Sequence, residues 1–265
     1  MPFPEAPKVI YKRNPLVQVI CQLRFPPILR IDTEAPAGFQ ECIRRDFPEF
    51  EEKEETRLGL SLPQRIQKDM AAELLREVIP SRTKNYEFAS QDRVWRVNLT
   101  RSFIALSTSK YRRGSEFNQK LEAPVRALRE MYKPAYFSRI GLRYVDVIKR
   151  SALGLRGVSW NELLKPAVLG LLSWRGVSEN IATLEGKCEI RLEDEKSMAR
   201  IVTGLVESEG NDEECFMIDT DFFNTDRTEI GDVRRMLEYF QVRGSRLIQW
   251  FITERLHAAM EPEEL

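Results

Sequence analysis

Two short segments near the middle of the chain alternate between apolar and polar residues, and only three residues separate them. In RVWRVNL, Trp95, Val97 and Leu99 share one face, while Arg96 and Asn98 share the other. FIALSTSKY follows after a gap that is typical of β-hairpins. A period of two predicts strands, and so short a connection requires the two strands to run antiparallel.

The same alternation recurs in other parts of the chain. TLEGKCEIRLE, ARIVTGLVES and CFMIDTDFF predict a three-stranded meander, in which Cys188 faces the core and Glu185, Lys187, Glu189 and Arg191 face outward. Further strands are predicted at VQVICQLRF, RLGLSLP, YEFASQ and FSRIGLRYVDVI.

Apolar residues at helical spacing predict the helices. We expect helices in AGFQECIRRDF, in SEFNQKLEAPVRALREMYKP, from Trp160 to Ser173, and from Asp232 to about Met260. In the last of these, Gly244 costs about 1 kcal/mol relative to alanine, so we expect it to lie against another element. The charged run from Glu51 to Glu55 is predicted to be a solvated connection.

These elements predict an α+β protein with mainly antiparallel sheets, helices on one face and a long C-terminal helix. We expect residues 1–150 to form an N-terminal half with a β-α-β-β-α-β-like order. We expect residues 151–265 to form a related C-terminal half, made of a helix, a β-meander and the long helix. The two halves could also share one continuous sheet as a single domain.

Composition limits the function classes. The 41 basic and 41 acidic residues balance, whereas proteins that coat duplex nucleic acid usually show a basic excess. The longest apolar runs are too short to span a membrane, and the N-terminus lacks the apolar core of a secretion signal. The four cysteines have no paired spacing that would suggest zinc or disulfides, so Cys21 and Cys188 are expected to be buried thiols. A cytoplasmic protein is expected.

Signatures of catalysis and of nucleotide binding are missing from the sequence. The single histidine, His257, lies near the predicted end of the last helix, where a cation interacts favourably with the helix dipole. The sequence has neither a G-x-S-x-G elbow nor a glycine-rich phosphate loop. We therefore assign no catalytic residue and predict no cofactor, and the sequence favours a non-enzymatic protein.

One carboxylate pair is a candidate metal site. Asp219 and Asp221 lie two apart on one predicted strand, and such oxygens could hold Mg²⁺ together with a substrate phosphate. Alternatively, the two aspartates face water or pair with arginines on a neighbouring strand.

Arginines on outward strand faces are candidates for binding an anionic ligand or nucleic acid, because guanidinium groups suit phosphates and carboxylates. A basic loop, KYRRGSE, adds two more arginines and an aromatic ring that could stack on a base. The candidates are Arg24, Arg96, Arg139, Arg143, Arg112 and Arg113. The competing interpretation is that Asp219, Asp221 and Glu189 neutralise the strand arginines. Asp146 is predicted on the apolar side of its strand, where a carboxylate would need a partner.

Several segments together resemble the signatures of a sporadically distributed, functionally uncharacterised prokaryotic protein family. They are NPLVQVICQLRFPPIL, VWRVNLTRSFIALSTSKY, SRIGLRYVDVI, MIDTDFF and LIQWFITERLHAAMEP, and they span nearly the full chain. Asp146 departs from the family's GLRY-x-N pattern. The resemblance implies a patchy distribution, which is typical of horizontally transferred genes such as those of antiphage defence and toxin–antitoxin loci.

Taken together, these features predict a non-enzymatic binding or regulatory protein that acts with a protein partner or self-associates, in a mobile defence-type locus. The alternative is an RNA- or nucleotide-binding protein that uses an arginine-rich sheet face. No membrane association is expected.

Overall fold

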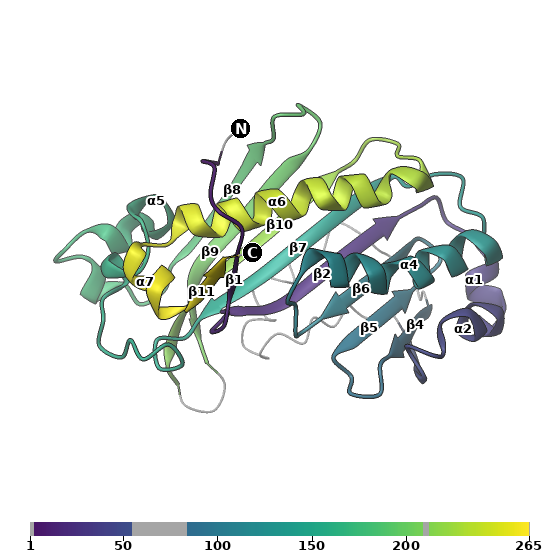
Figure 1. Cartoon of the computed structure of the whole chain (residues 1–265), viewed down its shortest axis with the longest axis horizontal. Helices are drawn as coiled ribbons and strands as arrows, with labels where there is room; N and C mark the ends of the chain where they lie inside the picture. Colours follow the sequence, from purple (N-terminus) through teal and green to yellow (C-terminus); the bar gives the residue numbers. More distant parts are fainter. Residues whose placement is uncertain (1–2, 55–83, 209–211, 265) are drawn as a thin grey trace. The chain divides into compact units, whose positions relative to one another are not determined.

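The computed structural model of the protein describes residues 3–54, 84–208 and 212–264 (Figure 1). The strands are β1 (Val9–Tyr11), β2 (Leu16–Arg24), β3 (Glu49–Glu54), β4 (Lys84–Ala89), β5 (Trp95–Leu99), β6 (Phe103–Thr108), β7 (Arg139–Ile148), β8 (Glu185–Arg191), β9 (Met198–Glu207), β10 (Glu214–Asn224) and β11 (Pro262–Glu264). The predicted strand in RLGLSLP lies outside the described residues.

Among the described residues, the helices include four 3₁₀ turns, which carry η labels. They are α1 (Arg30–Thr33), α2 (Ala37–Ile43), α4 (Gly114–Met131), η1 (Trp160–Glu162), α5 (Pro166–Leu169), η2 (Gly170–Ser173), η3 (Ser178–Asn180), η4 (Ile230–Asp232), α6 (Val233–Phe251) and α7 (Glu254–Ala259).

The predicted α+β class is confirmed. Among the described residues, nine strands form a mostly antiparallel sheet, and β1 pairs with β11 in a separate small sheet. The chain divides into two compact units. Unit 1 comprises Met1–Val17, Leu142–Asn224 and Arg235–Leu265, and unit 2 comprises Gln18–Gly141 and Thr225–Arg234.

In unit 2 the strand order is β3-β4-β5-β6-β2. The predicted hairpin is present as β5 and β6, which pair antiparallel with Leu99 opposite Ile104. The apolar side of this part of the sheet is covered by α4, where the rings of Phe117 and Trp95 lie 5.8 Å apart. The period-two alternation therefore places the core where the sequence predicts it.

In unit 1 the strand order is β7-β10-β9-β8, and the predicted meander is formed by β8, β9 and β10. The helix α6 runs along these strands (Figure 1). Its Phe240 ring lies 6.2 Å from that of Phe222 on β10. The expected close approach at Gly244 is confirmed, because a Cβ there would lie only 2.8 Å from the Tyr144 ring on β7.

The long C-terminal helix ends earlier than predicted, at Phe251 instead of about Met260. The Phe251 carbonyl accepts a hydrogen bond from Lys165 N–H at 2.9 Å, and Thr253 N–H donates to the Leu163 carbonyl at 2.9 Å. These backbone groups are therefore bonded to another segment instead of continuing the helix. The side chain of Thr253 then caps α7 by accepting from Leu256 N–H.

The helix predicted from Trp160 to Ser173 is wrong. The segment folds into three short pieces, η1, α5 and η2. Lys165 is extended, with φ −74° and ψ 151°, because the ring of Pro166 disfavours a helical conformation in the residue before it. Gly170 adopts a positive φ of 52° and ends α5.

Two further expectations fail at the borders of the sheet. Glu51 belongs to β3, where it pairs with Glu87 of β4, instead of lying in a solvated connection. Cys188 is exposed instead of buried. In the described part of the chain, β8 is the last strand of the sheet and has a hydrogen-bonded neighbour on one side only. Cys188 therefore stays exposed, although alternation places it on the same face as the core residues.

Candidate functional site

The polar face of unit 2 contains two of the predicted arginines, Arg24 on β2 and Arg96 on β5. Gln22 and Asn98 lie opposite the same residue of the intervening strand β6, Ala105, so they share this face. The Asn98 side chain is buried and donates to the amide oxygen of Asn85 at 3.1 Å. Gln22, Arg24, Arg96 and Asn98 therefore share one face, as predicted, but Asn98 is buried instead of pointing to solvent.

Arg139 belongs to the same unit and lies beside the end of β2. Ser138 N–H donates to the Arg24 carbonyl at 2.8 Å, which joins the two backbones. The Arg139 guanidinium lies over Gly141, where any Cβ would overlap it. Burial raises the pKa of Cys21, and the Arg139 charge opposes that rise. Gly141 thus provides the space that the Arg139 side chain occupies.

Arg143, in unit 1, has a partner within the protein. Its Nε donates to Asp219 Oδ1 at 2.7 Å and its Nη2 donates to Asp219 Oδ2, which forms a bidentate pair. Burial would lower the pKa of Arg143, but the charge and hydrogen bonds of Asp219 outweigh this effect and the pKa is raised. The structure therefore joins a predicted anion-binding residue to a predicted metal ligand.

The second predicted metal ligand, Asp221, lies on the same strand. It faces Arg200 across the β9–β10 ladder, and its charge also contributes to the raised pKa of Arg143. Arg200 Nε in turn contacts Glu189 Oε1 on β8 at 2.6 Å. Of the pairings that the competing interpretation proposed, the structure contains the one between Arg143 and Asp219, while Glu189 contacts an arginine outside the predicted set.

Asp146 is the buried carboxylate that the sequence placed on the apolar side of β7. Its exposed fraction is 8%. Burial, assisted by the nearby charge of Asp219, raises the pKa of Asp146 to about 7. A carboxyl group with this pKa is partly protonated at neutral pH.

Arg112 and Arg113 line a hollow of about 390 Å³ beside the first turn of α4, together with Ser115, Glu116 and Gln119. Arg113 occupies the N-cap position, where no side chain accepts from the helix N–H groups. The two arginines of the basic loop are therefore brought together with the positive end of a helix dipole.

A second hollow, of about 350 Å³, lies in unit 1 around His257. The Tyr11 hydroxyl and His257 Nδ1 form a hydrogen bond of 2.9 Å. Burial and the charge of Glu254 raise the pKa of Tyr11. Lys165 and Trp250 line the same hollow. Sequence reasoning missed this site, because Tyr11 and His257 are 246 residues apart in the chain and no local pattern relates them.

An apolar surface in unit 1 was also missed. Leu171, Trp174 and Val177 are exposed, and Trp174 is 67% exposed. Two successive turns link them, with Trp174 N–H donating to the Leu171 carbonyl at 3.1 Å and Val177 N–H donating to the Trp174 carbonyl at 3.2 Å. Residues three apart in such turns lie within about 7 Å. We call these three residues the apolar stripe.

A compositional signal for the apolar stripe exists in the sequence. Between Lys165 and Glu185 the only charged residues are Arg175 and Glu179, in a chain that is 31% charged. The predicted Trp160–Ser173 helix obscured this signal, because an apolar helix is expected to be buried.

Comparisons with known proteins do not assign this chain to a family. Neither the family models nor the curated proteins contain a match to this chain. Within residues 3–54, 84–208 and 212–264, no three His, Cys, Asp or Glu side chains are grouped so that they could hold a metal ion. In the same ranges, no helix is both long enough and apolar enough to cross a membrane.

Proposed function

We propose that this chain is a cytoplasmic, non-enzymatic binding protein that recognises a partner protein through the apolar stripe of unit 1. The observation that carries the proposal is the exposure of Trp174 and Leu171, at 67% and 60%, in a segment almost free of charge. The centres of protein interfaces are depleted in charged residues and enriched in aromatic ones.

A tryptophan is the most effective single residue for this purpose. Binding energy concentrates in a few residues, among which tryptophan is enriched, and truncation of such a residue costs about 2 kcal/mol or more. Leu171 and Val177 flank Trp174 and would exclude water from the contact. The matching partner surface is an apolar pocket wide enough for an indole, with an uncharged floor.

The test is native mass spectrometry of the protein isolated from its own cells. We expect a partner protein in fixed stoichiometry, which Leu171→Ser and Trp174→Ser each remove. Leu29 in unit 2 is 66% exposed, so Leu29→Ser is the matched control and should retain the partner. Equal effects of Leu29→Ser and Leu171→Ser would reject the apolar stripe as the binding surface.

The second candidate function is RNA or nucleotide binding by unit 2. Arg24 and Arg96 on the polar face favour it, as do Arg139 beside the end of β2 and Arg112 and Arg113 at the hollow beside α4. In the same mass spectra this function would give nucleic acid or nucleotide instead of protein. Arg24→Ala/Arg96→Ala would then release it, while Trp174→Ser would not.

The resemblance to a sporadically distributed prokaryotic family supports a role in a mobile antiphage-defence or toxin–antitoxin type locus. In that setting the partner is encoded beside this chain. Deletion of the gene should then raise phage plaque counts, and expression of the Trp174→Ser variant should fail to restore resistance. Restoration by that variant would separate the apolar stripe from any defence role.

A further inference from the structure

The strand β8 borders the sheet of unit 1. In the part of the chain that the structure describes, its one hydrogen-bonded neighbour is β9. Glu185, Lys187, Cys188, Glu189 and Arg191 are all exposed along it. A sheet border of this kind offers unpaired backbone groups to another strand.

The charges on β8 are arranged so that the strand complements itself. The side chains at positions 185, 187, 189 and 191 are Glu, Lys, Glu and Arg, so their charges alternate from negative to positive. Read in the reverse direction, the same four positions alternate from positive to negative. If two copies of β8 pair antiparallel about a twofold axis at Cys188, Glu185 faces Arg191 of the second copy and Lys187 faces Glu189. Opposite charges directly across an antiparallel pair are stabilising.

The backbone of β8 permits this register. Leu205 N–H donates to the Leu184 carbonyl at 3.1 Å, and Leu192 N–H donates to the Ser197 carbonyl at 2.8 Å. Hydrogen-bonding direction alternates along an antiparallel strand, so even-numbered residues bond toward β9 and odd-numbered residues bond away from it. In the register centred on Cys188, odd-numbered residues of one copy lie opposite odd-numbered residues of the other. The backbone N–H and C=O groups that point away from β9 in the two copies can therefore hydrogen-bond to each other.

The charged side chains are available for such pairs. In the described part of the chain, Glu185, Lys187 and Arg191 form no ion pair, while Glu189 contacts Arg200. A carboxylate has acceptor sites for a second donor, so the contact with Arg200 does not prevent Glu189 from pairing with a lysine.

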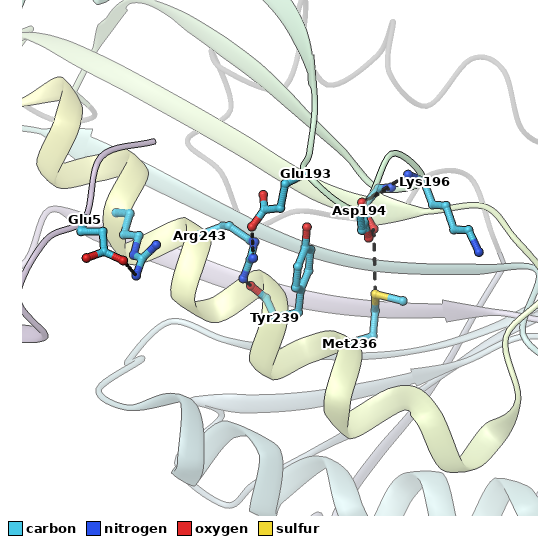
Figure 2. A network of polar contacts seen from close by, with 9 residues as sticks. Glu5, Glu193, Asp194, Lys196, Met236, Tyr239 and Arg243 are labelled. Atoms are coloured by element: carbon cyan, nitrogen blue, oxygen red, sulfur yellow. Dashed lines mark hydrogen bonds and ion pairs between the residues drawn. The ribbon is translucent and has the colours of Figure 1, made fainter. Parts of the chain in front are cut away.

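The loop that joins β8 to β9 is fixed to α6, as Figure 2 shows. Arg243 of α6 forms an ion pair with Glu193 and lies against the Tyr239 ring. Asp194 accepts from Ser197 N–H at 2.8 Å and from the Ser197 hydroxyl at 2.6 Å, which closes the turn. A strand that is already held in place loses less conformational entropy when it binds.

The strand at the other end of the sheet order provides a contrast. On β3, Glu49, Glu51 and Glu52 share one sign, with Lys53 as the only base between Glu49 and Glu54. Two copies of such a strand would repel each other, which is a common protection against association at a sheet border. The alternating charges of β8 give no such protection.

We propose that β8 is a self-association site, at which a second copy of this chain adds its own β8 antiparallel with Cys188 on the twofold axis. Unlike the recognition of a partner protein by the apolar stripe, this contact needs no other protein. A dimer would present two apolar stripes and strengthen binding to a multivalent partner.

Charge reversal tests the register, with sedimentation velocity as the readout. We expect the purified protein to dimerise in the micromolar range, because a contact between two strands lies at the small end of interface sizes. Glu185→Lys and Arg191→Glu should each weaken the dimer by roughly tenfold or more, because each creates two like-charge pairs. The double variant Glu185→Lys/Arg191→Glu should restore dimerisation. Glu130→Lys, an exposed change on α4, is the matched control and should have no effect.

Cysteine cross-linking tests the axis. In a non-hydrogen-bonded antiparallel pair the Cα atoms lie about 4.5 Å apart, within the range of about 4.4–6.8 Å that a disulfide spans. With copper phenanthroline as oxidant, two Cys188 thiols should lose two protons and two electrons and join rapidly. Cys188→Ser should abolish the cross-link, while Cys42→Ser, the other exposed cysteine, should keep it.

A monomer at all concentrations up to about 100 µM, a double variant that stays as weak as its parents, or a cross-link that survives Cys188→Ser would each overturn the proposal. None of these results bears on the apolar stripe, whose test uses Leu171→Ser and Trp174→Ser.

Discussion

Replacing Asp146 with asparagine removes a carboxyl group that is costly to ionise and keeps nearly the same shape. The pKa of Asp146 rises from 3.8 to about 7 on folding. The folded state therefore holds the proton more tightly, and stability falls as pH rises from about 4 to 7. At 1.36 kcal/mol for each pKa unit, the full loss is about 4 kcal/mol, and about 3 kcal/mol of it falls above pH 5.

Urea unfolding of the wild type and of Asp146→Asn at about pH 5, 6, 7 and 8 measures this effect. The free energy of unfolding of the variant, relative to wild type, should grow by about 2 kcal/mol from pH 5 to 7, reach a total gain of about 3 kcal/mol near pH 8, and then level off. Subtracting the wild type cancels the other titrating groups. Asp194→Asn is the control. Burial would raise the pKa of Asp194, but hydrogen bonds from Ser197 outweigh burial and lower it. The difference in free energy of unfolding between Asp194→Asn and wild type should therefore stay constant above pH 5. An Asp146→Asn difference that does not vary with pH would refute the reasoning.

Two further predictions concern packing and pairing in unit 1. Gly244→Ala should destabilise the protein by about 1–3 kcal/mol despite the better helix propensity of alanine, because the new Cβ overlaps the Tyr144 ring. In a Tyr144→Ala background the same change should stabilise it, and destabilisation in both backgrounds would contradict the packing argument. Arg143→Ala and Asp219→Ala should each cost about 3–5 kcal/mol, and the double variant should cost less than their sum in a thermodynamic cycle. Additive costs would show that the pair is not coupled.

Much of the fold follows from periodicity in the sequence. Alternation identified the β5–β6 hairpin and the β8–β10 meander, and a helical stripe identified α4 and most of α6. The expectation that Gly244 lies in a close contact also follows from local physics, since an interior glycine in a helix is costly unless something requires it.

The failures occur where distant residues decide the local structure. The end of α6 depends on hydrogen bonds from Lys165 and Thr253, which no helical period can reveal. The pairing of Arg143 with Asp219 depends on two strands that are far apart in the sequence. The sequence had left this pairing open as one of two interpretations. Cys188 is exposed because of where β8 lies in the strand order, and alternation carries no information about strand order.

Recognition of a partner protein by the apolar stripe is the central claim, and site-specific photocrosslinking in cells tests it most directly. A photoreactive residue at position 174 should cross-link one protein in stoichiometric yield, and Leu171→Ser in the same chain should abolish the product. The same group at position 29, which is equally exposed, should give none. No product at position 174, or the same products at both positions, would contradict the claim.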